Sequence, residues 1–99
     1  MCGVTAGGAD LEGVDVARQA VVAGRVLRGG EPVGGAYVRL LDGDGEFVAE
    51  VPTSATGQFR FFAAPGTWTL RTLAPGTDPV DRPVVARTGA VAEVEVVLP

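Results

Sequence analysis

Short valine-rich runs, separated by glycine, proline and aspartate, fill the chain from Gln19 onward. Valine is β-branched and favours strands, whereas glycine, proline and aspartate favour the turns between strands. The runs recur roughly every 8–12 residues, a spacing that is typical of a β-sandwich or barrel. The sequence therefore predicts an all-β fold, with strands at Ala20–Leu27, Ala36–Leu41, Phe47–Val51, Gln58–Phe62, Thr67–Leu73, Val84–Arg87 and Ala92–Leu98.

The beginning of the chain lacks this pattern. In residues 1–18, glycines and acidic residues interrupt every apolar pair, which predicts a flexible N-terminal arm before a single domain over residues 19–99. A helix over Val14–Leu27 is the one alternative, because this stretch also fits a helical hydrophobic stripe. Gly24 and the valines argue against the helix, since both lower helix propensity.

Side chains alternate between the two faces of a strand, so charged positions reveal which face is outside. Arg39, Arg60 and Arg71 mark the outer faces of their runs. The opposite positions form the predicted core: Val22, Val26, Val38, Leu40, Val51, Phe59, Phe61, Trp68, Leu70, Val94 and Val96.

Three large apolar residues fall on the outer faces by the same rule, namely Tyr37, Leu41 and Phe62. Clustered apolar residues on a surface mark an interface with a partner, whereas scattered ones do not. The three residues are therefore a candidate interface, and a homodimer formed through them is one alternative. We expect truncation of Phe62 to cost much less stability than truncation of Phe59.

Composition excludes several classes of partner. The 99 residues carry a net charge of −4, and the eight arginines are spread along the chain, which disfavours nucleic acid. No apolar run approaches the roughly 18 residues of a membrane helix, and the first 20 residues lack the pattern of a signal peptide. The single cysteine cannot form an internal disulfide. We therefore expect a cytoplasmic protein with no membrane or nucleic-acid partner.

The inventory of reactive side chains is also short. The chain has no histidine, so Ser54 lacks the base of a serine triad, and Cys2 alone cannot make a zinc site. The acidic stretch around Asp42 and Asp44 fits a hairpin turn better than a calcium loop. Trp68 fits the core better than a carbohydrate platform. The sequence therefore predicts a protein that is not an enzyme and has no metal or cofactor.

Five segments occur together in order: VVAGRV, PVGGAYVRL, TSATGQFRF, PGTWTL and VEVVL. This series resembles the carboxypeptidase regulatory-like domains. The resemblance covers about residues 20–99 and implies a seven-stranded transthyretin-like (prealbumin-like, Greek-key) β-sandwich. Among enzymes built on sandwiches of this kind, the hydroxyisourate hydrolases of the transthyretin-like group depend on histidines, and intradiol dioxygenases use histidine and tyrosine to bind iron. This chain has no histidine and one tyrosine, Tyr37.

A closer resemblance covers almost the whole chain, from MCG at the start through GEFVAEVPTSATGQFRFFAAPGTWTLR. These stretches resemble an actinobacterial family of unknown function that is often named as sulfurtransferase-associated. The resemblance implies a non-catalytic accessory or binding module in sulfur metabolism. It also implies a thiosulfate sulfurtransferase (rhodanese-like) as the partner.

Cys2 suggests an alternative chemical role. If Met1 is removed, the α-ammonium group of Cys2 lies close to its sulfur, and a nearby positive charge favours the reactive thiolate. On a flexible arm, such a thiolate is a candidate acceptor that carries sulfane sulfur as a persulfide. The opposing interpretation is an inert exposed thiol.

The carrier hypothesis is testable by intact-mass spectrometry. After incubation with thiosulfate and the sulfurtransferase, a carrier gains about 32 Da as one persulfide sulfur. Cys2→Ala is the control and gains nothing. An unchanged mass in the wild type, or an equal gain in Cys2→Ala, would contradict the hypothesis.

Overall fold

The structure is a computed structural model that describes residues 5–7 and 20–99. The described residues form nine strands: β1 (Thr5–Gly7), β2 (Ala20–Arg28), β3 (Glu31–Pro32), β4 (Tyr37–Leu41), β5 (Phe47–Pro52), β6 (Gln58–Ala63), β7 (Gly66–Leu73), β8 (Val80–Ala86) and β9 (Val91–Leu98). Within these ranges there is no helix that could cross a membrane.

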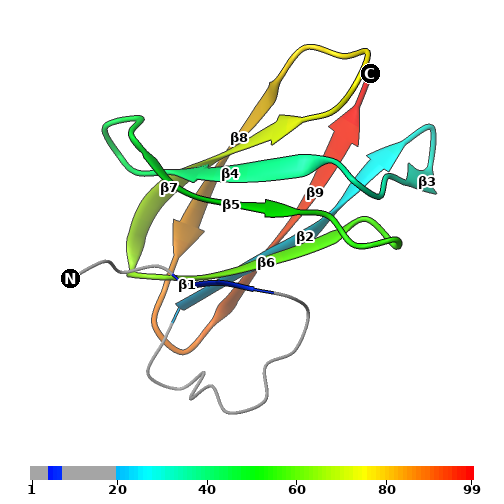
Figure 1. The fold of residues 1–99 in the computed structure, drawn as a ribbon. Coiled ribbons are helices and arrows are strands. Elements are labelled where there is room, and N and C mark those ends of the chain that lie inside the picture. The colour runs from blue at the N-terminus through cyan, green and yellow to red at the C-terminus, as the bar shows by residue number, and fades with distance from the viewer. Residues whose placement is uncertain (1–4, 8–19) are drawn as a thin grey trace.

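The strands form two sheets that pack face to face (Figure 1). In the first, which we call the β2 sheet, β2 pairs antiparallel with β6 and β3 and parallel with β9, and β1 pairs with β6. The second, which we call the β4 sheet, is antiparallel throughout, in the order β5-β4-β7-β8. The predicted all-β sandwich is confirmed.

Each of the seven predicted strands is present, and β2 replaces the helical alternative from Ala20 onward. The largest boundary error concerns β8, which begins at Val80 rather than Val84. Pro83 interrupts the pattern there, because proline cannot donate a backbone hydrogen bond inside a sheet. The structure accommodates Pro83 because β8 lies at the edge of the β4 sheet.

The predicted arm over residues 1–18 lies mostly outside the described residues. Thr5–Gly7 is the described part of it, and its backbone pairs antiparallel with β6 opposite Arg60, Phe61 and Phe62. The division of the chain after residue 18 stays a prediction.

The core between the sheets agrees closely with the prediction. Every predicted core side chain is buried except Val94, which is half-buried and packs against the core. Phe59 and Phe61 lie with their ring centroids 6.3 Å apart. Trp68 is also in the core, where its indole N–H donates to the Ala64 carbonyl oxygen at 2.9 Å. The core interpretation of Trp68 is confirmed.

The expectation that Leu41 and Phe62 are exposed is wrong, since they are 5% and 8% exposed. Leu41 lies on an inner strand of its sheet, between Thr69 of β7 and Phe47 of β5. Phe62 lies opposite the fully buried Val21 of β2, and neither residue belongs to the main core cluster. Alternation identifies the face of a strand, but it does not reveal whether that face is covered.

The burial of Phe62 changes the expected energetics. Phe62→Ala should now lower the free energy of unfolding by about 3 kcal/mol or more, close to the effect of Phe59→Ala, since both remove a buried ring. Phe47→Ala is the matched control, because Phe47 is 60% exposed. Urea unfolding of the three variants measures the difference. A loss for Phe62→Ala as small as that for Phe47→Ala would contradict the prediction.

Candidate functional site

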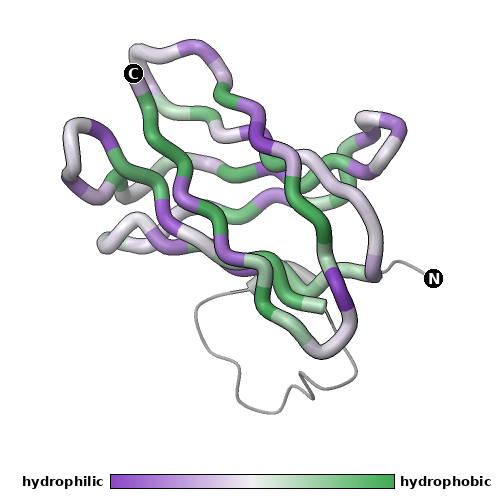
Figure 2. Tube along the Cα trace, turned by 180° about the vertical axis from the view of Figure 1, so that it is seen from behind, coloured by the Kyte–Doolittle hydropathy of each residue, from purple (hydrophilic) through white to green (hydrophobic). Residues whose placement is uncertain are grey.

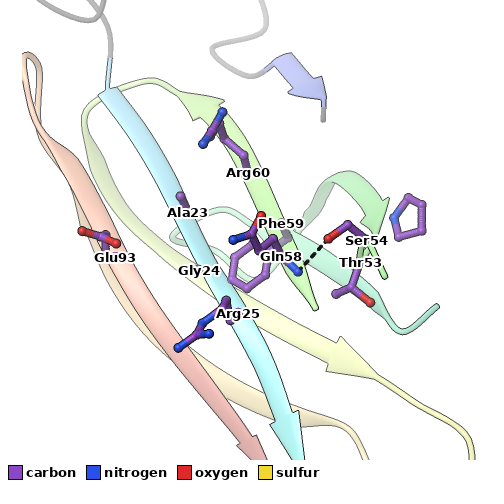
Figure 3. A pocket seen from close by; sticks show the side chains of 10 residues that line it. Ala23, Gly24, Arg25, Thr53, Ser54, Gln58, Phe59, Arg60 and Glu93 are labelled. Atoms are coloured by element: carbon purple, nitrogen blue, oxygen red, sulfur yellow. Dashed lines mark hydrogen bonds between the residues drawn. The ribbon is translucent and has the colours of Figure 1, made fainter. Parts of the chain in front are cut away.

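A recess of about 340 Å³ lies where β2, β6 and β9 meet the turn after β5 (Figure 3). Its lining comes from four separate parts of the chain: Ala23, Gly24 and Arg25 of β2; Gln58, Phe59 and Arg60 of β6; Glu93 of β9; and Pro52, Thr53 and Ser54 of the turn region. A smaller hollow of about 220 Å³ continues along β2 and β9 and is also lined by Gly24, Arg25 and Glu93.

Strand register explains why the surface is hollow here. Across β6, β2 and β9, the register forms one row of Arg60, Ala23 and Glu93. The middle residue of this row has only a methyl group, whereas its two neighbours are long and charged. Small residues between long ones leave a depression on the face of a sheet, and Ala23 therefore lies at the bottom of the recess.

The next row across the same strands consists of Gln58, Arg25 and Glu95. The Arg25 Nη2 and Glu95 Oε2 atoms lie 3.7 Å apart, and both side chains are more than half exposed. An ion pair in such an exposed position contributes little to stability. The two rows together place an arginine on β6 and carboxylates on β9, so the recess has a basic side and an acidic side.

Gly24 allows the strands to come close together beside the recess. It lies opposite Phe59 on β6 and Val94 on β9. A Cβ atom at this position would overlap the Val94 carbonyl oxygen and would lie 2.9 Å from Cζ of Phe59. The backbone oxygen cannot yield as a flexible side chain can, so this position requires glycine. The close approach of the three strands therefore depends on the glycine of the VVAGRV segment.

Thr53 holds the turn region that closes one side of the recess. Its buried hydroxyl accepts a hydrogen bond from the Ala36 amide at 3.0 Å and donates one to the Val33 carbonyl at 2.8 Å. The Thr53 amide also donates to the Ala36 carbonyl at 2.7 Å. These bonds tie the end of β5 to the loop before β4. This role of Thr53 was not predicted from the sequence, although Thr53 is the first residue of the TSATGQFRF segment.

Ser54 has a structural role in the same turn. Its hydroxyl oxygen accepts the Gln58 amide at 3.1 Å and lies 3.1 Å from the Thr56 hydroxyl oxygen. Its carbonyl accepts the Gly57 amide at 2.8 Å. No histidine is present in the chain to activate this hydroxyl. The position in a hairpin turn agrees with the structural interpretation of Ser54.

Two acidic residues that could be considered as cation ligands, Asp42 and Asp81, are engaged in local contacts. Asp42 Oδ1 accepts the amides of Asp44 and Glu46, each at 2.9 Å, as in an Asx-type turn. Asp81 accepts two hydrogen bonds from Arg71, at 2.8 and 2.9 Å, and these bonds lower the pKa of the Asp81 carboxyl group. In residues 5–7 and 20–99, no three potential ligands gather into a metal-binding group.

The structure does not bring the predicted interface residues together. Tyr37 is 50% exposed, but Leu41 and Phe62 are buried, and Phe62 belongs to the other sheet. Cys2, the candidate sulfur acceptor, lies outside the described residues. The recess itself was missed at the sequence level, because the parallel neighbour of β2 lies some seventy residues away along the chain.

The close approach at Gly24 leads to a prediction about stability. Gly24→Ala should lower the free energy of unfolding by about 3 kcal/mol, because the added methyl group forces β2 and β9 apart. Gly43→Ala is the matched control, since a Cβ atom there would meet its nearest neighbour, the Thr67 carbonyl oxygen, at 3.9 Å. Thermal or urea unfolding provides the measurement. Equal stability of the two variants would contradict the close approach.

Several solved structures share this architecture. The major pilin subunit BcpA of Bacillus cereus aligns with a TM-score of 0.71 at 21% identity, covering 82% of this chain but 29% of the pilin. A dioxygenase domain from a Streptomyces dioxygenase–carbohydrate-binding fusion protein aligns with a TM-score of 0.64 at 15% identity, covering 89% of this chain and 84% of that one. At such identities the likeness concerns the fold alone, which is the transthyretin-like sandwich.

Relatives of much higher identity are found in mycobacteria. An uncharacterized protein of Mycolicibacterium smegmatis is 57% identical over 86 residues, which cover 85% of this chain and 93% of the relative. The uncharacterized protein Rv0814c of Mycobacterium tuberculosis is 64% identical over 61 residues, and the chain spans 61% of that relative's length. The family model described as a protein of unknown function (DUF1416) matches residues 2–98. The chain therefore belongs to the DUF1416 family.

Proposed function

We propose that this chain is a non-catalytic accessory module that binds another protein through the recess on the β2 sheet. The observation that supports this proposal is the pair of side-chain rows across β6, β2 and β9. They present two guanidinium groups, one amide and two carboxylates around a hollow that has Ala23 at its bottom. Such an arrangement can recognise a polypeptide by ion pairs and hydrogen bonds.

The residues around the recess offer little for catalysis. Arginine, glutamine and the engaged Ser54 hydroxyl supply no general base that works near neutral pH. Glu93 is exposed, so its carboxylate is in contact with solvent rather than enclosed in a catalytic pocket. The solved dioxygenases share only the fold with this chain, which contains no histidine.

The proposed partner is a thiosulfate sulfurtransferase of the rhodanese type, in the cytoplasm. This part of the proposal rests on the resemblance of the MCG start and the long GEFVAEV segment to sulfurtransferase-associated proteins. The role is then that of an accessory subunit in sulfur metabolism. The sulfur-carrier role of Cys2 is a separate prediction with its own mass measurement, because no described residue bears on it.

The test is complex formation between the two purified proteins, measured by isothermal titration calorimetry or sedimentation velocity. Wild-type protein should bind the sulfurtransferase of its own genome with a Kd of about 50 µM or lower. Ala23→Gln should weaken binding about ten-fold or more, because the longer side chain fills the bottom of the recess.

Val85→Gln is the matched control. It also adds a glutamine to an exposed position, since Val85 is 49% exposed, but it lies on the β4 sheet, away from the recess. It should bind as the wild type does. Absence of a complex for all three proteins would overturn the proposed partner. Equal affinity of Ala23→Gln and wild type would show that the recess is not the binding surface.

A further inference from the structure

β9 lies at an edge of the β2 sheet. β9 pairs with β2 along its full length, from Val91 opposite Val21 to Leu98 opposite Arg28. Among the described strands, β2 is its only pairing partner. The strand contains no proline and no register shift between Val91 and Leu98. It therefore offers a long, regular edge.

The pairing pattern determines which backbone groups face away from β2. The Val21 amide donates to the Ala90 carbonyl at 3.2 Å, and Val21 is in register with Val91. In a parallel ladder, alternate residues of a strand direct their N–H and C=O groups toward the same neighbour. The even-numbered residues of β9 thus face β2. The odd-numbered residues direct their backbone groups to the outer edge.

The same odd-numbered residues also have exposed side chains: Val91, Glu93, Glu95 and Val97. Val91 is 45% exposed and Val97 is 57% exposed. Figure 2 shows the corresponding alternation of hydrophilic and hydrophobic positions along the strand that ends at the C-terminus. We call this set the β9 edge. It has a symmetric pattern, with two carboxylates between two valines.

In the β4 sheet, both edge strands have features that prevent the addition of another strand. β8 carries Pro83 in the middle of the strand, and β5 ends at Pro52 and has an additional residue, Val48, between its pairings with Leu40 and Leu41. Prolines and bulges prevent an edge from adding another strand. The β9 edge lacks both devices, and its exposed side chains then determine which strand can pair with it.

A second copy of this chain is disfavoured at the β9 edge in the register that pairs the two strands over their full length. In an antiparallel pair of two β9 strands centred on Val94, Glu93 of each copy lies opposite Glu95 of the other. Like charges directly opposite one another destabilise a sheet. A strand with arginine or lysine at the two central positions instead places opposite charges in register. Glu93 makes no ion pair with any described residue, and Glu95 has only the 3.7 Å contact with Arg25.

We propose that the β9 edge binds an extended basic segment of a partner protein by strand addition. The segment would follow the pattern apolar-x-basic-x-basic-x-apolar, in which x is any strand-forming residue. Backbone hydrogen bonds would hold the added strand, and alternate side chains would determine its sequence preference. The pattern is symmetric, so it fits either strand direction. This proposal rests on the proposed binding function, and it specifies the chemistry of the partner.

The experiment uses the full chain and the peptide acetyl-Val-Thr-Arg-Thr-Arg-Thr-Val-amide. Titration followed by backbone NMR should show saturable shifts concentrated in Val91–Leu98, with the odd-numbered amides of β9 gaining protection from solvent exchange. The same peptide with glutamate in place of arginine should show no binding. Lack of saturable binding of the basic peptide would overturn the proposal.

Charge variants test the side-chain contribution. Glu93→Gln/Glu95→Gln should weaken binding of the basic peptide about ten-fold, and Glu93→Lys/Glu95→Lys should reverse the preference toward the acidic peptide. Glu31→Gln/Glu46→Gln is the matched control, since both residues are exposed elsewhere and the net charge changes equally. Equal weakening by the control would overturn the proposal, because general electrostatics would then explain the binding.

Two N-methylated peptides test the backbone contribution. One carries the methyl groups on the valines and arginines, and the other on the threonines. In strand addition only one of these two sets donates to β9, so one peptide should lose binding and the other should retain most of it. Equal binding of both peptides would overturn strand addition. If the basic peptide binds and the sulfurtransferase does not, only the identity of the proposed partner fails.

Discussion

The close parallel contact between β2 and β9 is the constraint on which the rest of the β2 sheet depends. At Gly24 the Val94 backbone occupies the space that any other residue would need for its Cβ atom, and the Phe59 ring covers the same position from β6. An aromatic side chain across from a strand glycine compensates for the packing that glycine lacks. This contact fixes the register of three strands, and the register in turn creates the recess.

The two outer faces of the sandwich use their charges differently. On the β4 sheet, one row across the four strands reads Glu50, Arg39, Arg71 and Asp81, so each arginine has its own carboxylate. The Arg39 Nε–Glu50 Oε2 distance is 3.0 Å, and Arg71 forms a two-pronged contact with Asp81. On the β2 sheet, Glu95 of β9 has only the 3.7 Å contact with Arg25, and Glu93 forms no ion pair with a described residue. This difference between the two sheets is one reason for the proposal that a partner binds to the β2 sheet.

The candidate site was less predictable than the fold. The outward position of Arg60 followed from alternation, and Gly24 was recognised as a residue that disfavours a helix. The sequence could not reveal that β9 lies beside β2, because a parallel neighbour far along the chain leaves no local signal. Leu41 and Phe62 were misassigned for a related reason. Their faces were deduced correctly, but burial depends on which other parts of the chain lie beside those faces.

The sequence by itself determined the strands, the turns and most of the core, because these depend on β-branched residues, Gly and Pro positions and the two-residue period of a strand. It also determined that no histidine-based chemistry is available. Only the tertiary structure decided the strand order, the rows around Ala23 and the open edge at β9. These features depend on contacts between distant segments, and such contacts form only when the two sheets pack around a shared core.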